Sequence, residues 1–137
     1  MPVPFVAIAV GSVIAVGALA ACQKALKAAD AAPLPTLAGT EWGLAGDDRF
    51  VAFKTGGEVV GSGGCNNFFG SFEQNGDALT FGPLASTKKA CPPAVMAGER
   101  DWLDMLGRVR RVEATRLELV LFGDSGELAR LRRKDWD

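Results

Sequence analysis

The chain has 137 residues, of which 48% are hydrophobic, and its 15 basic and 16 acidic side chains leave a formal net charge of −1. This balance gives no electrostatic footprint for nucleic acid, so we expect no nucleic-acid partner. The chain has no histidine and three cysteines. A metal site would therefore depend mainly on carboxylates, and we expect neither a metal nor a cofactor.

The first 21 residues carry no charged side chain and are rich in Val, Ile, Ala and Gly. A secretory signal combines an apolar stretch of roughly 7 to 15 residues with small residues at the cleavage site. The segment Leu19-Ala20-Ala21-Cys22 resembles a bacterial lipobox, whose cysteine is joined to diacylglycerol and becomes the new N-terminus. We therefore predict a lipoprotein signal peptide over residues 1–21 and a membrane anchor at Cys22.

Two observations leave alternatives open for this segment. Pro2 and Pro4 stand where a signal peptide usually has Lys or Arg, so either the α-amino group alone supplies the positive charge or, as we favour, the start codon lies further upstream. About 20 apolar residues can also span a bilayer, and Lys24 and Lys27 would hold that flank in the cytoplasm as an uncleaved inner-membrane anchor. Gln23 after the cysteine instead resembles lipoproteins that are sent to the outer membrane, so we expect an outer-membrane lipoprotein facing the periplasm.

Residues 22–36 are rich in alanine, contain two prolines and offer no apolar face long enough to pack. They are predicted to form a flexible tether. Residues 37–135 are long enough for one small domain with its own core. We expect this domain to be monomeric.

Short strands and tight turns follow in the domain. The predicted strands lie at residues 40–44, 49–54, 59–60, 68–73, 79–81, 117–122 and 128–132. Gly56-Gly57, Asn75-Gly76 and Asp124-Ser125-Gly126 join successive strands into hairpins, because glycine and asparagine tolerate the positive φ of such turns.

One amphipathic helix is predicted between Pro92-Pro93 and Gly107. Its apolar stripe contains Val95, Trp102, Leu103 and Leu106 at helical spacing. Glu99 falls on the same stripe, so its carboxylate is expected to point towards the sheet. A buried carboxylate needs hydrogen-bond partners or a proton.

The order of these motifs resembles the META domain, the family that includes the heat-shock protein HslJ. The resemblance covers the whole predicted domain and is carried by Leu37-x-Gly39-Thr40-x-Trp42, Gly61-x-x-Gly64-Cys65-Asn66, Phe69-Gly70-x-Phe72, Leu79-x-Phe81, Ser86-Thr87-Lys88-Lys89-Ala90-Cys91-Pro92 and Glu99-x-x-Trp102-x-x-x-Leu106. It implies an α+β fold with a curved antiparallel β-sheet, a barrel-like meander, and one packed helix, often on envelope lipoproteins. The residues that carry the family motif are Gly64, Cys65, Asn66, Thr87, Cys91 and Glu99.

The resemblance implies no shared catalytic activity or cofactor. The chain departs from the family pattern at Phe69 and Phe72, where tyrosine is common, and at Lys89, where methionine is common. Any role that needs a phenol or a thioether at these positions is therefore not expected here.

If Cys22 carries lipid, Cys65 and Cys91 remain as an even pair in an oxidising compartment, where they could form a disulfide. The alternative is two buried thiols that act as small hydrophobes. Asn66 could bond to the backbone of a kinked strand or present its amide to a ligand. Gly61-Ser62-Gly63-Gly64 lacks the spacing of a phosphate-binding loop or a nucleophile elbow, so its glycines are interpreted as turn and packing positions.

We therefore expect a non-enzymatic, stress-associated envelope protein with no catalytic residues, which binds or stabilises a periplasmic protein partner. One alternative is a small inhibitor of a hydrolase such as lysozyme or a protease, acting through an exposed loop at residues 55–63. Another is an enzyme that uses Glu99 and Asn66.

Overall fold

The computed structural model of the protein describes residues 32–135. The predicted signal peptide, Cys22 and most of the predicted tether lie outside these residues. The described strands are β1 (Thr40–Gly43), β2 (Phe50–Phe53), β3 (Glu58–Ser62), β4 (Asn67–Asn75), β5 (Ala78–Phe81), β6 (Ala85–Ser86), β7 (Arg111–Ala114), β8 (Glu118–Gly123) and β9 (Gly126–Arg133), and the described helix is α2 (Pro93–Gly107).

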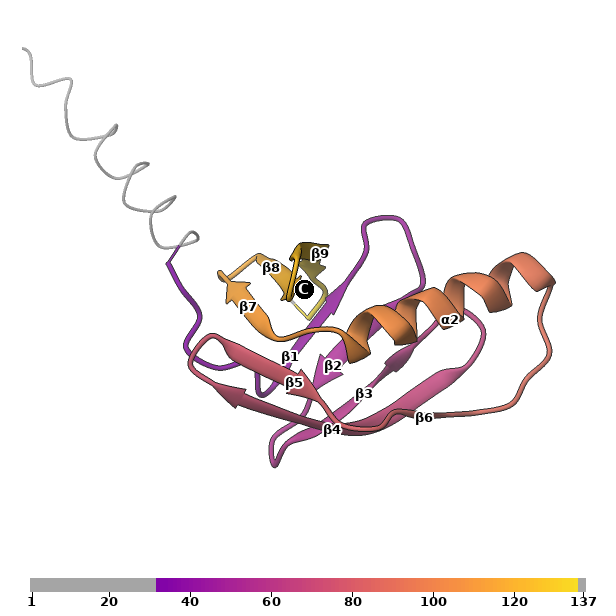
Figure 1. The fold of residues 1–137 in the computed structure, drawn as a ribbon, viewed down its shortest axis with the longest axis horizontal. Helices are drawn as coiled ribbons and strands as arrows, with labels where there is room; N and C mark the ends of the chain where they lie inside the picture. The colour runs from indigo at the N-terminus through magenta and orange to yellow at the C-terminus, as the bar shows by residue number, and fades with distance from the viewer. Residues whose placement is uncertain (1–31, 136–137) are drawn as a thin grey trace, which may run out of the picture.

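The strands form one antiparallel sheet that curves round and closes on itself (Figure 1). Their order is β3-β2-β1-β9-β8-β7-β5-β4, and β3 pairs with β4 to complete the ring. The short strand β6 is added to β4 outside this ring. The predicted α+β class with a curved antiparallel sheet and one packed helix is confirmed.

Side chains that alternate along the strands fill the ring. In β4, for example, Phe68 and Phe72 are buried while Phe69 between them is 51% exposed. Phe72 meets Phe53 edge-to-face, with ring centroids 4.9 Å apart. The fully buried side chains of the core include Leu37, Trp42, Val51, Phe53, Val59, Leu79, Leu106, Val109, Leu119, Leu121 and Leu131.

Helix α2 packs on this core through Trp102, Met105 and Leu106, which belong to the same buried cluster as the strand residues. Its bounds agree with the prediction, since a proline opens it and Gly107 is its last residue. Val95 was expected in the buried stripe but is 39% exposed, because it lies in the first turn before the helix reaches the core.

The predicted hairpins are present, and Gly56, Gly57, Gly76 and Gly126 all have positive φ as those turns require. The sequence prediction did not include β6 and β7. Strand β6 has only two residues, and β7 contains a single fully buried one, Val112, so neither shows a clear alternating pattern.

The weakest part of the ring is the contact between β5 and β7, where Ala78 and Arg111 are the only registered pair. The segment before β1 links β7 to β4, the two strands that lie on either side of β5. The amide of Leu34 donates to the carbonyl of Ala114 in β7 at 2.7 Å, and the amide of Leu37 donates to Oε1 of Gln74 in β4 at 2.9 Å. The last residues of the predicted tether therefore lie against the domain.

This bridge predicts that Gln74→Ala lowers the free energy of unfolding by about 1–2 kcal/mol, because the amide of the fully buried Leu37 loses its acceptor. Glu73→Ala is the matched control, since Glu73 is exposed on the same strand and should change stability by less than about 0.5 kcal/mol. Urea denaturation of the full chain measures both. Equal effects of the two substitutions would contradict the bridging role of Gln74.

Candidate functional site

The residues of the family motif come from three separate segments and meet at one place in the structure. Gly64, Cys65 and Asn66 form the connection between β3 and β4. Thr87 and Cys91 lie in the extended segment between β6 and α2, and Glu99 lies in α2. We call this group the motif cluster, and it consists of Gly64, Cys65, Asn66, Thr87, Cys91 and Glu99.

The carboxylate of Glu99 is the centre of the motif cluster. Its Oε2 accepts the backbone amides of Cys65 at 3.1 Å and Asn66 at 2.5 Å, while its Oε1 accepts Nδ2 of Asn66 at 2.8 Å. Glu99 is only 8% exposed, so these bonds replace the water that its charge would otherwise need. The helical spacing predicted this burial.

The amide group of Asn66 uses its whole hydrogen-bonding capacity inside the protein. Its Oδ1 accepts the hydroxyl of Thr87 at 2.9 Å and the backbone amide of Lys89 at 2.6 Å. Its Nδ2 donates to the carbonyl of Lys89 at 3.3 Å as well as to Glu99. Asn66 is 4% exposed and therefore acts as a structural link between the β3–β4 connection, the segment before α2, and α2 itself.

Cys65 and Cys91 form a disulfide with their Cα atoms 6.1 Å apart, which closes a sequence separation of 26 residues. The predicted pairing is confirmed. The bond joins the same two segments that Asn66 joins by hydrogen bonds, so a covalent and a polar link hold the start of α2 in one place.

Glycine is required where the β3–β4 connection passes α2. A Cβ on Gly63 would lie 2.5 Å from Cγ of Glu99, which is closer than real contacts allow. Gly64 has a φ of 106°, a conformation that favours glycine. The prediction that these glycines serve turns and close packing is confirmed, for packing at Gly63 and for the turn at Gly64.

The electrostatics of the motif cluster keep Glu99 ionised. Burial raises the pKa of its carboxyl group and is the largest single influence. The backbone and side-chain hydrogen bonds from Asn66 and the backbone hydrogen bond from Cys65 lower the pKa, and together they outweigh burial. The pKa of Glu99 is therefore below its ordinary value, which suits a hydrogen-bond acceptor and not a general acid.

Asp47, which lies just before β2, forms an ion pair with Arg49. Asp47 binds the guanidinium of Arg49 through both oxygens, at 2.9 and 2.6 Å. The hydrogen bonds from Arg49 lower the pKa of Asp47 to about 2. Across residues 32–135 no three Asp, Glu or Cys side chains are grouped so that they could hold a metal ion.

Trp102 carries the one buried side-chain nitrogen or oxygen without a hydrogen-bond partner in the described part of the chain. The guanidinium carbon of Arg49 lies 5.8 Å from the centroid of its ring, within the range of a cation–π contact. The guanidinium of Arg49 thus lies over the indole ring of Trp102, while its Nε and Nη2 atoms are bonded to the carboxylate of Asp47.

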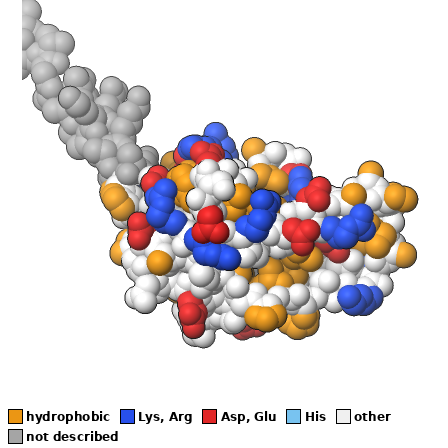
Figure 2. All heavy atoms as spheres, viewed as in Figure 1, with side chains coloured by type: hydrophobic (Ala, Val, Ile, Leu, Met, Phe, Trp, Pro, Cys, Tyr) orange, Lys and Arg blue, Asp and Glu red, His pale blue; other side chains and the backbone are white. Residues whose placement is uncertain are grey.

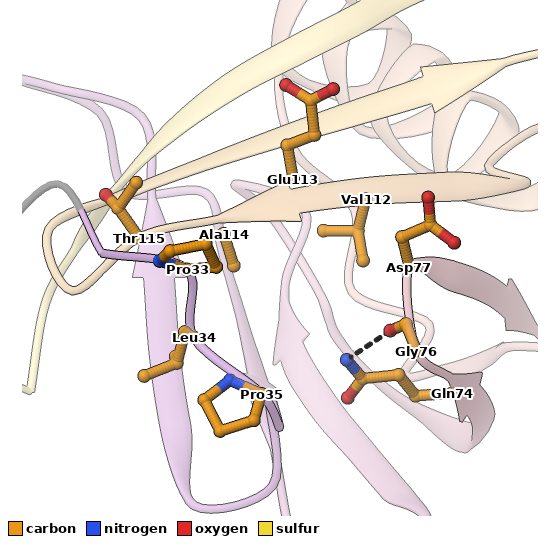
Figure 3. Close-up of a pocket in the computed structure, with 10 residues that line it drawn as sticks. All are labelled: Pro33, Leu34, Pro35, Gln74, Gly76, Asp77, Val112, Glu113, Ala114 and Thr115. Carbon is orange, nitrogen blue, oxygen red and sulfur yellow. Dashed lines mark hydrogen bonds between the residues drawn. The ribbon is translucent and has the colours of Figure 1, made fainter.

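A hollow of about 550 Å³ lies between the N-terminal segment and strand β7 (Figure 3). Leu34 and Pro35 face Gln74 and Gly76 across it, and Val112 points into it. The side-chain amide of Gln74 is already bonded to Leu37 and Gly76, and the carboxylates of Asp77 and Glu113 also belong to the lining. The rest of the lining is mainly apolar and comes from Pro33, Leu34, Pro35, Val112 and Ala114.

The motif cluster predicts that Glu99→Gln lowers the free energy of unfolding by roughly 3 kcal/mol, because a side-chain NH₂ or a weaker acceptor replaces the charged one. The stability that the ionised carboxylate contributes is complete above the unfolded pKa of 4.5 and is lost as the pH falls through the lower folded pKa. In denaturant titrations of the full chain, the free energy of unfolding should therefore fall less below pH 4.5 for Glu99→Gln than for the wild type. Asp101→Asn, an exposed change on the same helix, is the control. Parallel pH profiles for wild type and Glu99→Gln would refute the role of the charge.

The disulfide predicts that Cys65→Ser and Cys91→Ser each lower the melting temperature by a similar amount, and that the double variant is no less stable than either. The chain-entropy estimate for such a loop is roughly 3 to 4 kcal/mol. Thermal unfolding of the oxidised full chain and its variants measures the effect. Additive losses in the double variant would indicate two independent thiols.

Within the described range no helix has the length and hydropathy needed to cross a bilayer.

Comparison with solved structures shows where this fold occurs elsewhere. An NMR structure of a protein from Burkholderia xenovorans is similar, with a TM-score of 0.62 and 23% identity over 72% of this chain and 84% of that one. A second NMR structure of a protein has a TM-score of 0.54 and 22% identity, and covers 72% of this chain and 90% of its own.

At these identities the two structures are evidence of the fold alone. No curated protein matches the chain. The sequence pattern of the META domain matches residues 34–136, which include every residue of the motif cluster. The chain therefore belongs to the META-domain family.

Proposed function

We propose that this META-domain protein is a lipid-anchored component of the cell envelope that binds or stabilises a partner and does not catalyse a reaction. The observation that carries the proposal is that the polar atoms of Glu99 and Asn66 are all bonded within the protein. The motif cluster is thereby used to hold the fold together.

An enzyme that uses Glu99 and Asn66 would need at least one of these groups to reach a substrate. Both oxygens of Glu99 accept protein hydrogen bonds, and Asn66 is 4% exposed. A substrate that displaced these hydrogen bonds would break the link between α2 and the β3–β4 connection. Cys65 and Cys91 are bonded to each other, so neither supplies a thiolate nucleophile.

The proposed location has two supports. Leu19-Ala20-Ala21-Cys22 has the order of a lipobox, and Gln23 suits transfer to the outer membrane. The disulfide between Cys65 and Cys91 is typical of oxidising compartments and rare in the cytoplasm. An uncleaved anchor that kept the domain in the cytoplasm would place this disulfide in a reducing compartment, so we favour the periplasmic face of the outer membrane.

A stress-associated role agrees with how the domain is held together. A closed ring, a disulfide and a buried polar cluster all resist partial unfolding of the segments they join. We propose that the protein keeps its binding surface intact under conditions that unfold less constrained envelope proteins.

The alternative of a hydrolase inhibitor loses the loop on which it depended. Residues 55–63 were expected to be an exposed loop, but Glu58–Ser62 is strand β3 of the ring. Val59 in this strand is fully buried, and Gly61 packs against the ring of Phe68. Only the turn at residues 55–57 remains free to enter a cleft, so the structure offers no specific support for inhibition.

The proposed anchor predicts the mass of the protein purified from the membranes of its host without reducing agent. Intact mass spectrometry should show a chain that begins at Cys22, carries acyl groups and lacks two hydrogens because of the disulfide. The variant Cys22→Ser is the control and should remain unacylated. A wild-type mass that keeps residues 1–21 and two free thiols would refute both the location and the lipid anchor.

A further inference from the structure

Strand β6 is an edge strand. It pairs with β4 through Phe68–Ser86 and Phe69–Ala85, and none of the other described strands pairs with it. The pairing continues beyond β6, because the amide of Thr87 donates to the carbonyl of Asn67 at 3.0 Å. An edge strand exposes backbone groups that another extended chain can pair with.

The free backbone groups of this edge belong to Ser86 and Lys88. In an extended chain the backbone N–H and C=O groups of alternate residues point to opposite sides. Thr87 and Lys89 point towards β4 and Asn66, where their bonds are made. Ser86 and Lys88 therefore point the other way, and no bond outside the β4 ladder involves their backbone among residues 32–135.

Ser86 and Lys88 are among the residues that line a groove of about 380 Å³ between the β6 segment and helix α2. One wall is the chain from Ser86 to Ala90, and the other is formed by Met96, Arg100 and Leu103 of α2. Figure 2 shows hydrophobic side chains exposed in the strip between α2 and the strands below it, with Lys and Arg side chains on both sides of its right-hand part. The groove therefore offers backbone pairing, apolar contact and charge at one place.

The unpaired charges of the groove are positive. Lys88, Lys89 and Arg100 line it, are exposed, and make no ion pair within residues 32–135. Glu99 also lines it, but both of its oxygens are bonded inside the motif cluster. Asp101 and Asp104 line a separate hollow on the next face of α2. A ligand in the groove would meet three free cations and no free carboxylate.

We propose that this groove binds an extended acidic segment of a protein partner, which adds to the free edge of β6 as a further strand. Backbone bonds to Ser86 and Lys88 would hold the segment, carboxylates would meet Lys88, Lys89 and Arg100, and apolar side chains would contact Met96 and Leu103. The inference deepens the proposed binding role by naming the chemistry of the partner, and it does not depend on the lipid anchor.

The test uses the full chain in detergent and a fluorescein-labelled octapeptide of alternating Asp and Val. Fluorescence anisotropy at low ionic strength should show binding that weakens as salt is added. Two comparison peptides separate the contributions. Replacing Asp with Lys removes the charge match, and N-methylating every residue keeps the charge but leaves no N–H to pair with β6. Neither of these peptides should bind.

Protein variants locate the site. Combining Lys88→Glu with Arg100→Glu should weaken binding by about tenfold or more. Lys54→Glu is the matched control, because Lys54 is exposed outside the groove, and it should change binding by less than about twofold. In NMR spectra of the wild type, the amides of Ser86 and Lys88 should shift and exchange more slowly with solvent when the peptide is added.

Three results would overturn the proposal. Equal binding of the N-methylated peptide would mean that charge alone attracts the ligand. Protection of Ser86 and Lys88 in the protein without peptide, together with a dimer in analytical ultracentrifugation, would mean that a second copy occupies the edge. Absence of binding by the acidic peptide would remove the site, while an acylated Cys22 would leave the envelope function standing.

Discussion

The carboxylate of Glu99 fixes helix α2 to the connection between β3 and β4, and the rest of the site depends on this contact. Two successive amides, of Cys65 and Asn66, can point at one oxygen only if the connection turns sharply past the helix. Gly63 permits that approach, because any side chain there would collide with Glu99. Once Asn66 is held, its own amide orients the segment before α2, and the disulfide closes the same arrangement covalently.

This dependence gives the motif residues a structural reason to occur together. A buried carboxylate next to an asparagine resembles a catalytic pair when only residue types are considered. In the structure both oxygens of Glu99 and both polar atoms of the Asn66 side chain are hydrogen-bonded within the protein, and these bonds lower the pKa of Glu99. The surface that remains available for binding lies beside the cluster, at the edge of β6 and along α2.

Local sequence signals predicted the hairpins, the helix and the burial of Glu99, because turn glycines and helical spacing act over a few residues. They did not predict β6, β7 or the closure of the ring. Strand β6 forms because β4 extends beyond the part of it that pairs with β5. Strands β1 and β9 pair although nearly the whole domain separates them in the sequence. The partners of Asn66 and the groove beside β6 were missed for the same reason, since both arise from tertiary contacts between distant segments.

The central claim is that Glu99 binds the amides of Cys65 and Asn66 in the folded protein, so that the motif cluster is structural. Amide hydrogen exchange measured by NMR tests it at the atoms concerned. The account predicts that the amide of Asn66, which lies outside any ladder bond, exchanges as slowly as a core strand amide such as that of Leu121. Exchange of the Asn66 amide as fast as that of an exposed turn residue such as Gly76 would contradict it.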